Sequence, residues 1–337
     1  MGSESRNRYL LKNTLIFTLG NIGSRMISFF LIPLYTNVLT MSQYGTVDLI
    51  TTISTVAGPM LTLNIAESVM RFGLDKDADK EKNTQCGSIV LLIAMIIGLV
   101  LIPICRCITE VSDYAMYVYF YVISLSASQL FLCDLRGKEL LLKYSLGNIL
   151  QTLMIAILNI TFLLVFKMET GGYLLAYIIA NFIVAIYAII AGKGYKAFSF
   201  HNIDRCKLKE MIRYSVVLIP NTFMWWIMNS SDRVMVTYMI GAAANGIYAV
   251  SYKLPTLVST LTGIFNQAWS YSAIREEGTS DETEYNNKMF KTLSAIAFMM
   301  GIGLLLLTKP FLGVYVADSY YDAWKYTPFL IVGCVYL

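Results

Sequence analysis

Long apolar segments recur along this chain, each as long as a membrane is thick. A helix needs about 20 apolar residues to cross a hydrocarbon core of about 30 Å. Runs of roughly this length or more lie at 13–38, 46–70, 86–105, 114–133, 145–166, 171–192, 214–240, 246–270 and 289–308. The sequence therefore predicts a polytopic membrane protein.

The composition agrees with membrane insertion. Of the 337 residues, 56% are hydrophobic and only 14% are charged, and the mean hydropathy is +0.59. Soluble domains carry about 25% charged residues. Only helices and closed barrels satisfy their backbone hydrogen bonds inside a membrane, and these runs are too long for the short alternating strands of a barrel. We expect an all-α fold.

A tenth apolar run begins near Tyr326 and reaches Leu337. Twelve residues rise only about 18 Å in a helix, so this run cannot span a membrane alone. We expect the natural chain to continue beyond Leu337.

Lys and Arg residues are distributed unevenly between the connecting segments. Nineteen of the 26 lie in 1–12, 71–85, 134–143, 193–213 and 271–291, and four lie in the alternate segments. The positive-inside rule places the richer set, and with it the N-terminus, in the cytoplasm. The polar N-terminal segment leads directly into a full-length apolar run, so we expect no cleavable signal peptide.

The remaining three cations, Arg25, Arg233 and Lys253, lie inside apolar runs. A Lys or Arg at the centre of a spanning helix costs about 2.5–3.5 kcal/mol on insertion scales, so it usually faces a cavity. These three residues are our candidates for binding an anionic substrate.

The chain resembles itself at an offset of 201 residues. This offset places Tyr44-Gly45 on Asn245-Gly246, and we expect both pairs in charge-free outer loops. Transporters are often built from two such repeats around a cavity and work by alternating access. We expect an N-terminal six-helix lobe at 1–192, a basic cytoplasmic linker at 193–213, and an incomplete second lobe at 214–337.

Polar residues spaced one helical turn apart form stripes on the first two runs of each half. Such stripes either bond neighbouring helices together or line water, and the pattern leaves both interpretations open. The candidate cavity-lining residues are Asn21, Ser28, Asp48, Thr52, Thr55, Asn229, Thr256, Thr260 and Gln267.

Arg233 and Lys253 lie at a similar depth on successive runs, each about two helical turns from the outer face. Two turns of helix rise about 10 Å. The two cations either bind an anion together or form structural ion pairs. Asp48 lies near the outer end of its run, far from the depth of Arg25. Asp232 is expected to pair with Lys253 or with another span.

No constellation for catalysis or metal binding is visible. The six cysteines have no metal-ligand spacing, and the single His201 lies in the basic linker. Phosphate-binding loops, nucleophile elbows and dinucleotide fingerprints are also missing from the sequence. We expect no metal, no cofactor and no enzymatic activity, and we expect the basic loops to meet anionic lipid rather than nucleic acid.

Two stretches resemble a known family: NTLIFTLGNIGSRMISFFLIPLYTNVLTMSQYGTVDLI and NSSDRVMVTYMIGAAANGIYAVSYKLP. They are similar to the polysaccharide-export branch of the multidrug/oligosaccharidyl-lipid/polysaccharide exporter superfamily. Within this branch, the O-antigen and capsule repeat-unit flippases are the nearest resemblance.

The resemblance implies two helical lobes around a central cavity. It also implies a flippase that moves an undecaprenyl-pyrophosphate-linked oligosaccharide to the outer leaflet of the bacterial inner membrane. Arg25, Arg233 and Lys253 are the positions that fit the family's cavity cations. The implied partners are anionic lipids and, in the same process, a polysaccharide polymerase and glycosyltransferases.

Three alternatives remain open. A cation-coupled multidrug exporter of the same superfamily would need an acidic cavity, whereas the deep charges here are basic. A flippase for a peptidoglycan precursor would share the mechanism and differ in cargo. A scaffold for a glycosyltransferase complex would not transport at all.

Overall fold

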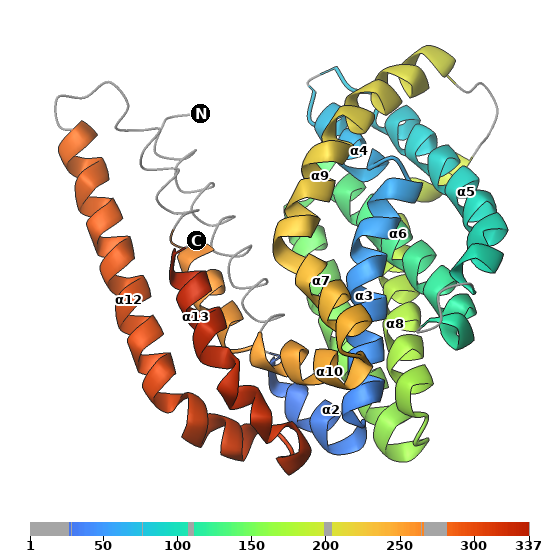
Figure 1. Ribbon diagram of the computed structural model, residues 1–337. Helices are drawn as coiled ribbons and strands as arrows, with labels where there is room; N and C mark the ends of the chain where they lie inside the picture. Colours follow the sequence, from blue (N-terminus) through green and yellow to red (C-terminus); the bar gives the residue numbers. More distant parts are fainter. Residues whose placement is uncertain are drawn as a thin grey trace.

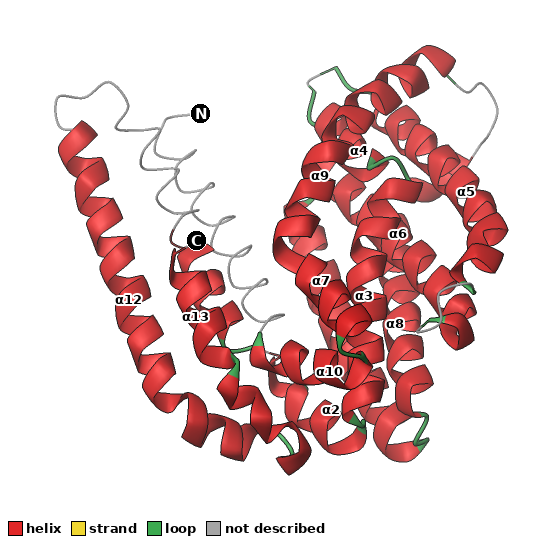
Figure 2. Ribbon diagram, viewed as in Figure 1, coloured by secondary structure: helices red, strands yellow, loops and turns green. Residues whose placement is uncertain are grey.

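The computed structural model describes residues 27, 29–75, 77–106, 111–198, 204–263, 265 and 282–336. Within these residues the chain is all-α and contains no strand, as Figure 2 shows. The labelled helices in Figure 1 are α2 (Ile32–Val38), α3 (Met41–Leu61), α4 (Ile65–Gly73), α5 (Lys80–Cys105), α6 (Ala115–Gly137), α7 (Leu141–Ile160), α8 (Glu169–Ala191), α9 (Arg205–Met239), α10 (Ala242–Ser251), α12 (Glu282–Tyr315) and α13 (Thr327–Tyr336). Short 3-10 or π segments are η1 (Ser112–Tyr114), η2 (Thr161–Val165), η3 (Gly194–Phe198) and η4 (Asp318–Lys325).

The predicted polytopic membrane fold is confirmed. Five stretches in the described part of the chain are long and apolar enough to span a membrane, and the bent pair α3–α4 makes a sixth if it counts as one span. The five are Lys80–Pro103, Ser112–Gly137, Leu141–Val165, Glu169–Ala191 and Asn286–Tyr315. Helix α9 does not meet the same criterion, because polar side chains lower its mean hydropathy.

The second predicted run, 46–70, is bent rather than straight. Helix α3 ends at Leu61, and α4 leaves it at an angle of 60°. Leu63 and Asn64 form the bend with φ angles of 52° and 55°, the left-handed region that residues other than Gly rarely adopt. Pro59 stays inside the last turn of α3, so the bend follows the proline by one turn.

The two expected outer loops are helical. Thr40 and Gln43 form a capping box, in which the Gln43 N–H donates to Thr40 Oγ1 at 3.3 Å and the Thr40 N–H donates to Gln43 Oε1 at 2.9 Å. Helix α3 therefore begins at Met41, and Gly45 lies inside it. Helix α10 begins at Ala242, directly after Gly241, whose φ is 120°.

Helices α3 and α10 cross in backbone contact. A Cβ on Gly45 would lie 1.8 Å from the Ala242 carbonyl oxygen, and a Cβ on Gly246 would lie 2.1 Å from the Met41 carbonyl oxygen. Both pairs are related by the offset of the internal repeat, so the contact maps onto itself when the halves are exchanged. Such an isologous contact marks the pseudo-twofold axis of the repeat.

Helices α12 and α13 lie beside each other and splay away from the main bundle in Figure 1. They join the bundle through hydroxyl groups near η4. Tyr315 donates to the Phe29 carbonyl at 2.5 Å, and Tyr320 donates to the Leu39 carbonyl at 3.0 Å. Ser251 of α10 donates to the Ala323 carbonyl of η4 at 3.1 Å. Helices α12 and α13 are therefore anchored at the end of the bundle where α3 and α10 cross.

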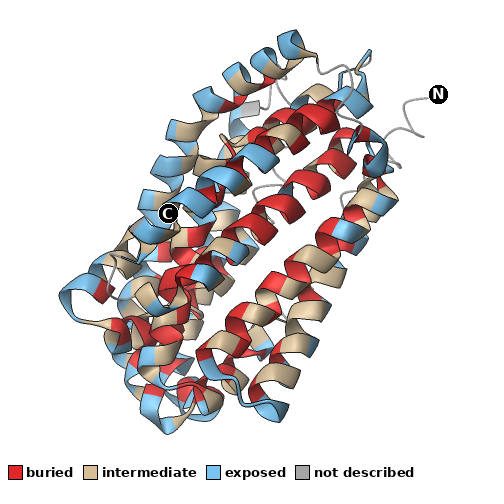
Figure 3. Cartoon of the chain, turned by 90° about the vertical axis from the view of Figure 1, so that its right-hand side faces the viewer, coloured by how far each residue is buried: buried red, intermediate tan, exposed pale blue. Residues whose placement is uncertain are grey.

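Buried residues run along the inward faces of the packed helices, as Figure 3 shows. One core cluster surrounds Leu49 and Leu174 near the α3–α10 crossing, and another surrounds Ile65 and Leu130 near the α3–α4 bend. The predicted basic linker is partly helical, because residues 205–213 form the first turns of α9. Helices α9 and α10, assigned to the second lobe by the sequence, pack against α3.

Candidate functional site

An ion pair joins the two halves of the chain near the α3–α10 crossing. Arg233 of α9 donates from Nη1 to Asp48 Oδ1 of α3 at 2.7 Å. The side chains are 16% and 7% exposed, so water screens this pair only weakly. Arg233 Nε has no hydrogen-bond partner among the described residues, which leaves one donor of the guanidinium unused. Of the two alternatives for Arg233, the structural ion pair is present here, with Asp48 as its partner.

Asn245 of α10 holds Asp48 from the other side. Its Nδ2 donates to the Gly45 carbonyl at 2.9 Å and lies 3.4 Å from Asp48 Oδ2. The amide is fully buried and reaches across the pseudo-twofold axis. Three helices therefore fix the position of the Asp48 carboxylate.

Asp232 does not pair with Lys253. Its Oδ2 accepts a hydrogen bond from the Tyr248 hydroxyl, and its Oδ1 accepts one from the Arg233 N–H at 2.9 Å. The Arg233 guanidinium also lies over the ring of Tyr252, with 5.2 Å between Cζ and the ring centroid. Tyrosines of α10 and the following turn therefore enclose the charged residues.

Lys253 lies in the turn Tyr252–Leu254, between α10 and the helical residues that begin at Pro255. It forms no ion pair with any residue that the structure describes. The charges of Arg233 and Asp48 both act on its ammonium group, one repelling and one attracting it. Lys253 is thus a partly buried cation near a carboxylate that is already bonded to Arg233.

The predicted polar stripes of α3 and α9 face each other. Trp226 Nε1 donates to the Thr52 carbonyl at 2.9 Å, and Thr55 Oγ1 donates to the same oxygen at 2.7 Å. Asn229 lies less than one turn further along α9, is exposed, and donates to the carbonyl of Trp225 at 2.8 Å. Thr52 therefore lies at the contact between α3 and α9, and Thr55 and Asn229 lie within one turn of the two residues that make this contact.

The hydroxyl groups of Thr256 and Thr260 are used within their own helix. Thr256 donates to the Lys253 carbonyl at 2.6 Å, and Thr260 donates to the Thr256 carbonyl at 2.7 Å. Four other candidates, Asn21, Arg25, Ser28 and Gln267, lie outside the described residues. The sequence did not single out Tyr248 or Tyr252, although their spacing of one helical turn places both rings on one side of the chain.

Comparison with known families decides where this fold belongs. The model of the polysaccharide biosynthesis protein family matches residues 10–271. The chain belongs to this family. It therefore falls in the polysaccharide-export branch of the exporter superfamily, as the two quoted stretches predict. No curated protein sequence matches the chain.

Solved structures of multidrug transporters share the fold. An inward-facing multidrug resistance MATE family transporter of the MOP superfamily has 13% identity and a TM-score of 0.63, covering 94% of this chain and 82% of that one. An outward-facing transporter of the same description has 14% identity and a TM-score of 0.58, and the match covers 96% of this chain and 78% of that one. The MATE multidrug transporter DinF-BH in complex with R6G has 15% identity and a TM-score of 0.58, and the match covers 94% of this chain and 77% of that one. At these identities the likeness concerns the fold alone.

Proposed function

We propose that this membrane protein is a flippase for a lipid-linked oligosaccharide. Its substrate would be an undecaprenyl-pyrophosphate-linked repeat unit of a surface polysaccharide. The protein would move it from the cytoplasmic to the outer leaflet of the bacterial inner membrane, with its own N-terminus in the cytoplasm. Membership of the polysaccharide biosynthesis family supports this cargo class.

The proposal depends on the observation that Lys253 forms no ion pair with any residue that the structure describes. An ammonium group without a carboxylate partner is costly in a membrane-embedded site, and a bound diphosphate would compensate it. Arg233 lies close enough for its charge to act on Lys253 and keeps an unpartnered Nε. A diphosphate carries more negative charge than Asp48, so it would compete with Asp48 for the Arg233 guanidinium.

The polar faces of α3 and α9 would receive the sugars. Thr55 and Asn229 are both exposed, and the Trp226 ring stacks on Phe223 at 6.2 Å between centroids. Hydroxyl, amide and aromatic groups together suit the polar edges and apolar faces of sugar rings. Movement of one half against the other about the α3–α10 crossing would give alternating access.

A multidrug exporter fits the site less well. Binding a cationic drug requires a carboxylate that is free to meet it. Asp48 is bonded to Arg233 and Asn245, and Asp232 is bonded to Tyr248. The two carboxylates of the described site are therefore already occupied.

The test replaces Lys253 with Gln in cells whose surface polysaccharide depends on this protein. We expect loss of most surface polysaccharide with an unchanged amount of protein in the membrane, because the diphosphate loses its uncompensated cation. Lys325→Gln is the control, since Lys325 is 52% exposed and pairs with Asp322 at 2.8 Å. Normal polysaccharide from Lys253→Gln would refute the proposed site.

In the export test, Arg233→Gln is informative only together with Asp48→Asn. Removing Arg233 alone would leave a buried carboxylate without its partner and would impair folding. The double variant keeps the charge balance; Asn keeps the shape of Asp48, and Gln replaces Arg233 with a shorter polar side chain. We expect it to fold and to export less polysaccharide than wild type, because the second phosphate contact is lost.

A further inference from the structure

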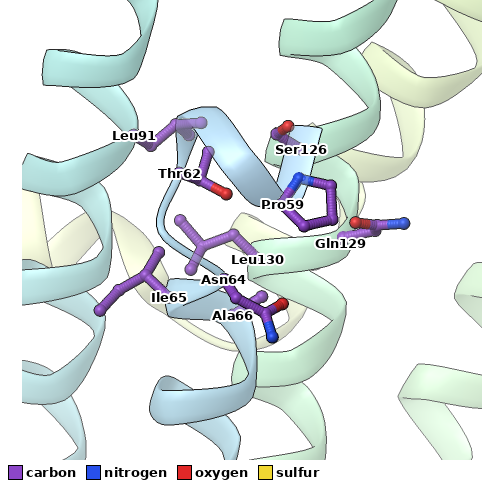
Figure 4. A pocket seen from close by; sticks show the side chains of 9 residues that line it. All are labelled: Pro59, Thr62, Asn64, Ile65, Ala66, Leu91, Ser126, Gln129 and Leu130. Carbon is purple, nitrogen blue, oxygen red and sulfur yellow. The ribbon is translucent and has the colours of Figure 1, made fainter. Parts of the chain in front are cut away.

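The α3–α4 bend contains a small cavity, shown in Figure 4. Its volume is about 10 Å³. Thr62 and Asn64 come from the bend, and Ser126 and Gln129 come from α6. The space corresponds to about one water molecule.

One lining side chain lacks a partner. Ser126 is 5% exposed, and its Oγ forms no hydrogen bond with the described residues. A Cβ on Gly58 would lie 2.9 Å from this oxygen, so the hydroxyl points at the surface of α3. An unbonded hydroxyl in an apolar interior is costly, and buried hydroxyls usually have a protein or water partner.

The charges around the cavity indicate what kind of molecule can occupy it. The cavity lies between the C-terminal turn of α3 and the first residues of α4, Ile65 and Ala66. The negative end of one helix dipole and the positive end of the next therefore meet there, and no charged side chain lines the space. Opposed ends favour a neutral donor and acceptor over an ion of either sign.

We propose that an ordered water molecule occupies this cavity and hydrogen-bonds to Ser126. It would act as a wedge that holds the bend between α3 and α4 and links it to α6. Bound water inserted beside a broken helical ladder is a recognised cause of sharp bends. The proposal stands whether or not the chain transports a lipid-linked sugar.

The bend also positions α9. Asn64 Nδ2 donates to Thr222 Oγ1 at 3.3 Å, and Ser68 of α4 donates to the Met211 carbonyl at 3.0 Å. Both partners belong to α9, the helix that carries Arg233. Water in the bend would therefore help to set where α9 lies against α3 and α4.

The variant Ser126→Ala tests whether water is bound, because the direction of the change in melting temperature differs between a bound water and an empty cavity. If the hydroxyl has no partner, alanine removes a penalty and the melting temperature rises. If water bridges it, alanine removes a hydrogen bond, and we expect the melting temperature of the purified chain in lipid nanodiscs to fall by about 2 °C. Ser124→Ala is the control, because Ser124 is buried on the same helix and donates to the Tyr121 carbonyl without lining the cavity.

Radiolytic footprinting gives a direct readout. Ionising radiation converts bound water to hydroxyl radicals, which label adjacent side chains even when bulk water cannot reach them. Leu130 and Ile65 line the cavity and are only 2% and 1% exposed. We expect labelling of both in wild type, at least about fivefold weaker labelling in Ser126→Ala, and no change in Ser124→Ala.

Two results would refute the proposal that water occupies the cavity. A higher melting temperature in Ser126→Ala together with no labelling of Leu130 would show an unbonded hydroxyl in a dry cavity. A melting temperature that rises saturably with NaCl but not with choline chloride, and loses this response in Ser126→Ala, would show a sodium site instead. Neither result affects the Lys253→Gln test, which reads surface polysaccharide.

Discussion

The two halves meet through the same backbone contact but bring different charges to it. Gly45 and Gly246 occupy equivalent positions at the crossing of α3 and α10. One turn further, the first half has Asp48 and the second has Ala249. Two turns further, the first half has Thr52 and the second has Lys253. The repeat therefore builds the scaffold, and departures from the repeat build the charged site.

The halves also break their helices at different places. Helix α3 continues past Gly45 as far as Leu61 before it bends, whereas α10 ends at Ser251, little more than one turn after Gly246. The earlier break places Lys253 in the turn that follows α10, where its N–H bonds the Val250 carbonyl at 3.0 Å. The first half keeps Thr52 inside a helix, so only the second half can present a cation from a turn beside Asp48.

The largest expected effect comes from breaking the shared contact. Gly45→Ala places a methyl group against the Ala242 carbonyl, and we expect a loss of about 3 kcal/mol in unfolding free energy. The measurement is thermal or denaturant unfolding of the purified chain in detergent. Gly246→Ala should be nearly as costly, because the contact is symmetric.

Gly303→Ala is the matched control for this prediction. Gly303 lies inside α12, and a Cβ there meets no atom within 4 Å. Alanine should raise helix stability there by about 0.5–1 kcal/mol. Equal stabilities of the Gly45 and Gly303 variants would mean that the helices do not touch at the crossing.

Asp48→Asn should have the second largest effect and separates charge from shape. The amide keeps the size of the carboxylate but leaves Arg233 without its counter-ion, and we expect a loss of about 2 kcal/mol. Unfolding of Asp48→Asn, Arg233→Gln and the double variant together gives the coupling energy. Additive losses in this cycle would show that the two side chains do not interact.

Trp226→Phe tests the smaller contact between the polar stripes. The substitution removes the N–H donor to the Thr52 carbonyl together with the second ring of the indole, and the lost hydrogen bond alone should cost about 1 kcal/mol in unfolding free energy. Trp225 is 59% exposed, so Trp225→Phe serves as the control. If the control loses as much stability as Trp226→Phe, the hydrogen bond to α3 carries no weight.

Much of the fold follows from hydropathy alone. The runs at 86–105, 114–133, 145–166 and 171–192 correspond to α5, α6, α7 with η2, and α8, because long apolar stretches have no other stable form in a membrane. The start of α3 also had a signal, since Thr40 and Gln43 have capping-box spacing. That segment also contains no charge, which favours an outer loop, and this prediction is wrong because the residues are helical.

The bend at Thr62–Asn64 has a sequence signal only in Pro59, one turn before it. Leu63 adopts a left-handed φ without Gly or Pro beside it, so tertiary packing decides its conformation. The Asp48–Arg233 pair joins residues 185 apart, and no spacing rule reaches that far. The internal repeat could not choose Asp48 as the partner, because the repeat matches Asp48 with Ala249.

The Gly45–Gly246 contact bears on the ancestry of the chain. Two identical half-length proteins would use such a contact to form a closed dimer, because each copy would offer the same glycine to the same carbonyl of the other. A single-chain descendant would be free to change one copy at a time. An acidic residue could then arise in one half and a basic residue in the other. Two identical chains could not differ in this way, because each would carry the same residue at each position.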